Sequence, residues 1–199
     1  MKILLATGNK KKRAEFERMF QPLGIELLPA GDLPDTIEDA PDFAGNARKK
    51  ASEAALAANA WALADDSGLA VDYLDGEPGV NSARFAGEHG DDAANNRLLL
   101  EELDGLNPEN RGAHFVCALC LCRPDGTPAI EVEGRSHGQI LEVARGTNDF
   151  GYDPLFLFTE PGFPETGRGF AELSKAEKAS ISHRGRALAA LAARLGELA

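Results

Sequence analysis

Short apolar runs alternate with segments of helical spacing in the first part of the chain. Residues 2–6 and 25–28 are almost wholly apolar and predict two buried strands. Between them, apolar residues recur every three or four positions, which predicts a helix over 10–23 that Gly24 ends. A strand, a helix and a second strand in this order are typical of an α/β protein.

An alanine-rich segment and a further apolar run continue this alternation. Residues 43–60 place their alanines on one helical face and predict a long helix. The run 61–64 predicts a strand that ends where the sequence DDSG (residues 65–68) forms a turn. The acidic segment 32–42, which contains two prolines, predicts an ordered loop.

Hairpins dominate the second half of the chain. A helix is predicted over 93–103, followed by strands over 114–122 and 129–133 around a turn at 124–126. Further strands are predicted over 138–143 and 154–158. A capping box from Ser174 to Glu177 and a last helix over 184–195 follow. Since the sequence has no internal repeat or linker, we expect residues 1–199 to form one α/β domain. Its mixed central sheet should be flanked by helices.

The charge balance restricts the partners of the protein. The 21 Lys and Arg against 32 Asp and Glu give a net charge of −11, which argues against a general nucleic-acid binder because such proteins need a broad positive surface.

The longest apolar run, residues 115–122, is far shorter than the roughly 20 residues of a membrane helix. The apolar run near the N-terminus is too short for a secretory leader, and three cysteines fit a reducing compartment. We therefore expect a cytoplasmic protein without a membrane or nucleic-acid partner.

Three stretches could bind a small anion. In the first, the sequence TGNKKK (residues 7–12) leads from a strand into the first turn of a helix. Lysines are disfavoured at this positive end of a helix dipole unless an anion binds there. A solvated basic helix start explains the stretch about equally well, and the Walker pattern GxxxxGK[ST] is absent.

The second stretch is the pair Asp65 and Asp66 at the end of a predicted strand. Carboxylates at this edge suit Mg²⁺, which takes one or two protein carboxylates beside water and phosphate oxygens. Because successive strand side chains point apart, one aspartate could reach a metal while the other braces the turn. A pure turn role is the alternative. The acidic loop, with Glu38 and Asp39, could supply a second ligand.

The third stretch lies in the C-terminal half. Phe150 and Tyr152 belong to a loop with glycine and proline, where we expect them to be more exposed than core aromatics and able to stack on a purine. Asp153 can accept hydrogen bonds, and His183 and Arg184 can donate them. Loop packing and an ordinary helix start are the alternative.

The cysteines do not predict a zinc site. Cys117 and Cys120 form a CxxC within one predicted strand, so their side chains point to opposite faces and cannot chelate one ion. We expect these two and Cys122 to be buried core thiols.

Together, these stretches resemble the inosine/xanthosine triphosphate pyrophosphatase family. The matching sequences are TGNKKK (7–12), FAGNARKKA (43–51), DDSGLAVDYLDGEPGVNSARFAG (65–87), FGYDPLF (150–156) and FAELSKAEKASISHRGRAL (170–188). The resemblance implies a homodimer of two-lobed, Maf-related subunits with the nucleotide in a cleft between the lobes. It also implies Mg²⁺-dependent hydrolysis of ITP, dITP and XTP to the monophosphate and pyrophosphate, which keeps these nucleotides out of DNA and RNA.

The resemblance further implies roles for single residues. Asp66 is similar to a catalytic, metal-binding aspartate, and Glu38 to a second metal ligand. The implied substrate-binding residues are Thr7, Gly8, Asn9, Lys10, Lys11, Lys12 and Lys50 for the phosphates, Ser67 and Lys178 as further contacts, and Phe150, Gly151, Tyr152, Asp153, His183 and Arg184 for the base.

Two positions depart from the family pattern. The acidic loop is one residue shorter, so Asp39 could take the place of Glu38. Gly45 stands where the family commonly has a glutamate, so no role of that carboxylate carries over.

Two other functions fit parts of the sequence. A Maf-like nucleotide pyrophosphatase would share the architecture but act on other bases, and it should begin with a Ser-rich, Arg-containing turn where this chain has Thr7, Gly8 and Asn9. A nucleotide-sensing or RNA-binding module without turnover is the other alternative. The metal context of Asp66 disfavours a sensor, and the net charge of −11 disfavours RNA.

Overall fold

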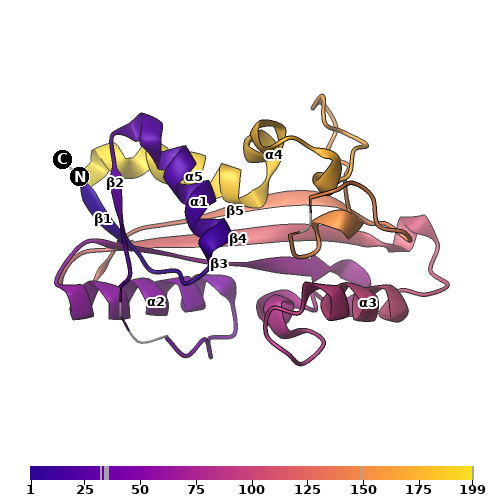
Figure 1. Ribbon diagram of the computed structural model, residues 1–199, viewed down its shortest axis with the longest axis horizontal. Helices are drawn as coiled ribbons and strands as arrows, with labels where there is room; N and C mark the ends of the chain where they lie inside the picture. The colour runs from indigo at the N-terminus through magenta and orange to yellow at the C-terminus, as the bar shows by residue number, and fades with distance from the viewer. Residues whose placement is uncertain (32, 34–35, 149, 199) are drawn as a thin grey trace. The chain divides into compact units, whose positions relative to one another are not determined.

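The structure is a computed structural model that describes residues 1–31, 33, 36–148 and 150–198, without the side chains of residues 10, 11 and 23 (Figure 1). Its strands are β1 (Lys2–Leu5), β2 (Glu26–Pro29), β3 (Ala62–Val71), β4 (Gly112–Cys122), β5 (Pro128–Ile140) and β6 (Phe156–Phe158). Its α-helices are α1 (Lys10–Phe20), α2 (Phe43–Ala58), α3 (Asp92–Glu102), α4 (Lys175–Ile181) and α5 (His183–Arg194). Short 3₁₀ helices include η3 (Gly79–Arg84), η5 (Asp153–Leu155) and η6 (Phe170–Glu172).

The strands of the described chain form one mixed sheet in the order β2-β1-β3-β4-β5-β6. Strand β1 runs parallel to β2 and β3, so that Leu4 faces Leu28 on one side and Ala62 on the other. Parallel neighbours need a crossover, and α1 supplies it between β1 and β2. The short loop 123–127 joins the neighbouring strands β4 and β5 into a hairpin. The predicted mixed α/β class and the hairpin are confirmed.

The chain divides into two compact units. Unit 1 comprises Met1–Asp66, Cys117–Gly134 and Gly185–Ala199, and unit 2 comprises Ser67–Val116 and Arg135–Arg184. Strands β3, β4 and β5 contribute residues to both units. Within the described part of the chain, none of the helices combines the length and hydrophobicity needed to cross a bilayer.

Unit 1 has a hydrophobic layer on each face of its part of the sheet. Ile3 and Leu5 point to one face, where they pack with apolar side chains of α1 and α5. Leu4 points to the other face and packs with alanines of α2. Figure 1 shows α1 and α5 on one side of these strands and α2 on the other. The period of two along β1 explains why so short a strand is buried on both faces.

The cysteines follow the same alternation along β4. Cys117 belongs to the layer under α1 and α5, whereas Cys120 and Cys122 belong to the layer under α2. All three cysteines are buried and form no disulfide, and the Sγ atoms of Cys120 and Cys122 lie 3.6 Å apart. The prediction of buried thiols on opposite faces is confirmed.

Unit 2 has a single core that is rich in aromatic residues. The ring of Phe115 on β4 lies 4.7 Å from that of Phe156 and 5.7 Å from that of Phe170, measured between centroids. Apolar residues of β3, α3, β5 and α4 complete this core. Tilted and stacked rings at these distances add to the burial energy, so these aromatic contacts stabilise the core of unit 2.

The predicted turn at residues 65–68 is wrong, because β3 continues through it to Val71. Gly68 lies so close to η3 that a Cβ there would be 2.3 Å from Ser82 Oγ and 2.6 Å from the Gly79 carbonyl oxygen. The glycine is therefore required by close packing and not by a turn. Asp65 and Asp66 consequently lie within a strand and not at its end.

The two predicted strands over 129–133 and 138–143 are one strand, β5, which ends at Ile140. Where the two predicted runs meet, its buried positions are Gly134, Ser136 and Gly138. Small residues at buried positions conceal the alternation of hydrophobicity, and for this reason the sequence predicts two strands where the structure has one. The predicted strand over 154–158 is shorter as well, because η5 occupies its first part.

Candidate functional site

The turn before α1 has local structural roles. Asn9 accepts a hydrogen bond from Lys12 N at its Oδ1, at 3.1 Å, and thereby caps the helix. Its own N–H donates to Thr7 Oγ1 at 3.2 Å. A Cβ at Gly8 would meet no described atom within 4 Å, so the backbone there is open to a ligand. The side chains of Lys10 and Lys11 lie outside the described part of the chain.

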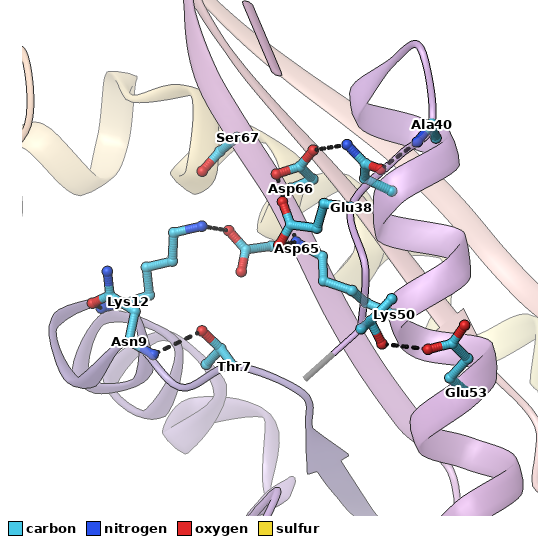
Figure 2. A network of polar contacts seen from close by, with 12 residues as sticks. Thr7, Asn9, Lys12, Glu38, Ala40, Lys50, Glu53, Asp65, Asp66 and Ser67 are labelled. Atoms are coloured by element: carbon cyan, nitrogen blue, oxygen red, sulfur yellow. Dashed lines mark hydrogen bonds and ion pairs between the residues drawn. The ribbon is translucent and has the colours of Figure 1, made fainter. Parts of the chain in front are cut away.

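Lys12 reaches from α1 to β3. Its Nζ lies 2.8 Å from Asp65 Oδ2, and the two side chains are 18% and 1% exposed (Figure 2). Asp65 therefore neutralises and positions Lys12, which corrects its predicted role in bracing a turn. A buried carboxylate needs such a partner, because burying an unpaired charge is costly.

Asp66 points toward α2, away from Lys12. It accepts a hydrogen bond from Asn46 Nδ2 at 3.0 Å, and its Oδ1 lies 3.5 Å from Lys50 Nζ. The same ammonium lies 3.0 Å from Glu38 Oε1, so Lys50 bridges the two carboxylates that the sequence predicts as metal ligands (Figure 2). Asn46 also accepts from Ala40 N at 3.0 Å and so ties the acidic loop to this cluster.

The electrostatics of this cluster favour a further cation. Burial raises the pKa of Asp66 and Glu38 raises it further, while Lys50 and Asn46 act in the opposite direction. Burial opposes the charge of Lys50, yet Asp66, Asp65 and Glu38 together raise the pKa of that ammonium. A bound cation stabilises the charged form of a buried carboxylate that lies next to another carboxylate.

The two acidic loop residues have different surroundings. Asp39 pairs with Lys49 Nζ at 2.7 Å, and its side chain is 65% exposed. The hydrogen bond from Lys49 lowers the pKa of Asp39. Glu38 shares the ammonium of Lys50 with Asp66, so the geometry groups Glu38 and not Asp39 with Asp66.

The donor set fits Mg²⁺ better than zinc. In residues 1–31, 33, 36–148 and 150–198, no group of three or more His, Cys, Asp or Glu is arranged to hold an ion. Glu38 and Asp66 offer two hard oxygen donors, which matches the few protein ligands that Mg²⁺ takes while water and phosphate fill its other positions.

Gly45 is fixed by packing at the start of α2. A Cβ there would lie 2.7 Å from that of Ala40, and Gly45 N donates to Asp42 Oδ1 at 2.7 Å. A glutamate at this position would displace the acidic loop. The departure from the family pattern is therefore consistent with the local packing of this chain.

A second group of predicted residues gathers in unit 2. Lys178 forms an ion pair with the buried Asp153. The Nζ of Lys178 lies 5.2 Å, and the Cζ of Arg184 5.9 Å, from the centroid of the Phe150 ring. Arg184 Nη2 also donates to Ser67 Oγ at 3.1 Å. Lys178 and Arg184 thus both lie at distances from the Phe150 ring at which a cation interacts with an aromatic side chain.

Two residues of this group are more buried than the sequence suggests. Tyr152 is 4% exposed and donates from its hydroxyl to the Ser82 carbonyl oxygen at 2.9 Å, so the prediction of an exposed, stacking Tyr152 is wrong. Burial raises the pKa of this hydroxyl. His183 is buried as well and stacks on Phe115 at 4.7 Å between ring centroids. Phe150 is half-buried and is the aromatic of this loop that can offer a face to a ligand.

The predicted residues thus form two groups, one in each unit. The group of unit 1 holds Thr7, Gly8, Asn9, Lys12, Glu38, Lys50 and Asp66, and the group of unit 2 holds Ser67, Phe150, Gly151, Tyr152, Asp153, Lys178, His183 and Arg184. Sequence reasoning missed Asn46 as a partner of Asp66 and Asp65 as the partner of Lys12. The motif FAGNARKKA contained Asn46, but only the fold shows which side chain it contacts.

The comparisons with known proteins cover nearly the whole chain. The model of the Ham1 family matches residues 3–194. A protein of Exiguobacterium sibiricum named dITP/XTP pyrophosphatase is 50% identical, with 99% of this chain and 100% of that protein covered. The solved structure of a Ham1 protein from Coxiella burnetii is 38% identical and superposes with a TM-score of 0.88 over 99% of both chains. The crystal structure of a nucleoside-triphosphatase, or dITP/XTP pyrophosphatase, from Mycobacterium abscessus is 47% identical, with a TM-score of 0.77 over 96% of this chain and 98% of that one.

Proposed function

The chain belongs to the Ham1 family, and from this premise we propose that it hydrolyses non-standard purine nucleoside triphosphates, namely dITP, ITP and XTP. The products are the nucleoside monophosphate and pyrophosphate. The observation that carries the proposal is the cluster of Glu38, Lys50 and Asp66 next to the Lys12–Asp65 pair. Full-length similarity to proteins named dITP/XTP pyrophosphatase supports it.

We assign the triphosphate to the group in unit 1. Lys12 and Lys50 supply positive charge, and the first turn of α1 supplies backbone N–H groups with the positive end of the helix dipole. Asp65 keeps the ammonium of Lys12 in place through its buried ion pair. The sequence TGNKKK adds Lys10 and Lys11 at the same helix start, so lysines gather at this turn in a protein with a net charge of −11.

Glu38 and Asp66 are the residues that would hold Mg²⁺. When bound, the ion would supply positive charge that offsets the negative charge of a triphosphate. Asn46 keeps one oxygen of Asp66 in a fixed direction, because its amide donates to Oδ2. The carboxylate is therefore oriented before substrate arrives, and preorganised groups of this kind lower the barrier without rearranging during the reaction.

The reaction is an in-line displacement at the α-phosphorus. A water molecule forms the new P–O bond while the bond from the α-phosphorus to the bridging oxygen of the β-phosphate breaks. The oxygen of the water stays on the monophosphate, and the electron pair of the broken bond leaves with pyrophosphate. Asp66 orients this water and accepts its proton, a contribution that rests mainly on positioning.

We assign the base to the group in unit 2. Hypoxanthine and xanthine carry an oxo group at position 6, which accepts a hydrogen bond from Arg184 or His183, whereas adenine presents an amino donor there. A buried donor facing a donor loses its hydrogen bond, and such mismatches discriminate by as much as about 10⁴-fold. The cation pair over Phe150 supports recognition of a flat, electron-rich base.

The test is to incubate the purified protein with ITP and Mg²⁺ and to separate the nucleotides and pyrophosphate. We expect IMP and pyrophosphate in equal amounts from the wild type and no release in excess EDTA. Asp66→Asn should lower kcat by at least about 100-fold with the fold retained. Asp39→Asn removes an equal charge from an exposed site and is the matched control. Near-normal turnover of Asp66→Asn would contradict the assignment.

The same assay separates the competing functions. Tight binding of ITP without turnover would identify a nucleotide sensor, and preference for pyrimidine or standard triphosphates would identify a Maf-like specificity. The homodimer, the cytoplasmic location and the cleft between two lobes stay predictions of the family resemblance. Sedimentation of the purified protein tests the homodimer.

A further inference from the structure

Two side chains of α3 hold one residue of the loop 150–153 from both sides. The N–H of Gly151 donates to Asp92 Oδ2 at 3.0 Å. Its carbonyl oxygen accepts from Asn96 Nδ2, also at 3.0 Å. Asp92 and Asn96 are four residues apart in a helix and therefore share a face. They form a bracket, in the sense that Asp92 and Asn96 together satisfy both backbone polar groups of Gly151.

The bracket rests on a well-fixed helix. Asp91 caps α3 by accepting from Ala94 N at 2.9 Å, and the buried Asn95 accepts from Ala86 N at 2.8 Å. Leu99 anchors the same helix in the core of unit 2. Because these contacts fix the rotation and tilt of α3, the positions of Asp92 and Asn96 are fixed with them.

The bracketed residue needs its conformation held. Gly151 has a φ of +55°, and a Cβ there would meet no described atom within 4 Å. Packing therefore does not hold this position, and a glycine loses more conformational freedom on ordering than any other residue. The two hydrogen bonds from α3 supply the constraint that side-chain packing does not.

Two residues of the loop 150–153, Phe150 and Asp153, contact the cations that we assign to the base. Phe150 precedes Gly151, with its ring beneath Lys178 and Arg184. Tyr152 follows it and is tied to Ser82, and Asp153 is tied to Lys178. Of the four loop residues, Tyr152 and Asp153 are thus held through their side chains, and Gly151 is held through its backbone.

We infer that Asp92 and Asn96 are positioning residues for the selection of a 6-oxopurine. They act through Gly151, whose backbone sets the direction of the Phe150 ring against Lys178 and Arg184. The inference rests on the proposed function, because it assigns the base to this loop. Displacement of a recognition group by about 1 Å can cost about 10²-fold in rate, so an unheld loop should lose selectivity before the protein loses its fold.

The experiment uses isosteric variants and measures kcat and KM for ITP and for ATP. Asn96→Asp replaces the donor by a carboxylate facing the Gly151 carbonyl oxygen, and Asp92→Asn weakens the acceptor. We expect kcat/KM for ITP to fall about tenfold in Asn96→Asp, mainly through KM, and the ratio of ITP to ATP turnover to fall with it. Asp92→Asn should also lower kcat/KM for ITP and the ratio of ITP to ATP turnover, but by a smaller factor.

Matched controls separate positioning from stability. Asn107→Asp adds the same charge at an exposed position outside α3, and Asp91→Asn removes the same charge at the cap of α3. Neither should change the ITP to ATP ratio. If Asn96→Asp lowers the thermal midpoint, Asp92→Asn decides the question, because Asp92 is exposed and its replacement adds no charge.

The outcomes distinguish this inference from the proposed function. An active wild type whose ITP to ATP ratio is unchanged in both bracket variants would overturn the inference alone. A fall of the ratio that Asp91→Asn reproduces would also overturn it, since asparagine caps a helix as well as aspartate and the effect would then come from the lost charge and not from the hydrogen bonds to Gly151. A wild type that releases no pyrophosphate from ITP would overturn the proposed function and this inference with it.

Discussion

The adjacent residues Asp65 and Asp66 contact different helices because successive side chains of a strand point in opposite directions. Asp65 faces Lys12 of α1, and Asp66 faces Asn46 and Lys50 of α2. The divergence could be predicted from the sequence, since it follows from the geometry of any strand. The partners could not, because they lie on helices whose docking depends on the packing of the whole unit.

The geometry separates the two candidates for the proposed second metal ligand, because Glu38 shares Lys50 with Asp66 and Asp39 pairs with Lys49. Glu38→Gln should lower activity with ITP and Mg²⁺ by about 100-fold or more and raise the Mg²⁺ concentration needed for half-maximal rate, because it removes one of two carboxylates from the cluster. Asp39→Asn should leave both values near those of the wild type. Steady-state rates over a Mg²⁺ titration give both quantities. The reverse pattern would assign the ligand to Asp39 instead.

Helix α4 shows how much a local pattern can determine at the scale of one element. Ser174 accepts from Glu177 N at 3.2 Å, and Glu177 Oε2 accepts from Ser174 N at 2.7 Å, so the predicted capping box is confirmed. The box needs only residues three positions apart, which is why the sequence reveals it. The helix in turn carries Lys178, which we assign to the group that binds the base.

The extended strands show the opposite case. The sequence DDSG indicates a turn by its composition, but Gly68 serves close packing against Ser82, a residue 14 positions later. The small buried residues of β5 likewise hide its alternation. In both strands the deciding contact is tertiary, so the local pattern could not predict it.

The cap of α4 has a pH dependence that can be measured. Hydrogen bonds from Arg168 and Ser174 lower the pKa of Glu177 from 4.5 to about 2. A carboxyl group with a lowered pKa in the folded state stabilises that state fully above about 4.5, and this contribution is lost as the pH falls toward about 2. Glu177→Gln keeps the capping pattern but loses the charge.

Urea unfolding of the wild type and of Glu177→Gln tests this dependence. The wild type should be the more stable of the two at pH 7, and the difference should shrink as the pH is lowered through 4.5 toward 2. Glu88→Gln changes an exposed glutamate outside α4 and is the control. A difference that stays constant over this range would show that the charge of Glu177 is not responsible.

At the scale of the whole molecule, the motifs are more informative than the charge. A net charge of −11 argues against nucleic-acid partners but says nothing of where the cations lie. The motifs span nearly the full chain, and this is why the family could be identified from them and is confirmed by the match over residues 3–194. The division of the chain into two units, each with its own group of site residues, follows from long-range contacts that no single motif contains.

The central claim is that water attacks the α-phosphorus of a non-standard purine triphosphate at the cluster of Glu38, Lys50 and Asp66. Hydrolysis of ITP with Mg²⁺ in water enriched in the heavy oxygen isotope ¹⁸O, followed by mass spectrometry of both products, tests this claim most directly. The claim predicts one labelled oxygen in IMP and none in pyrophosphate. Label in pyrophosphate, or release of IDP with inorganic phosphate, would contradict it.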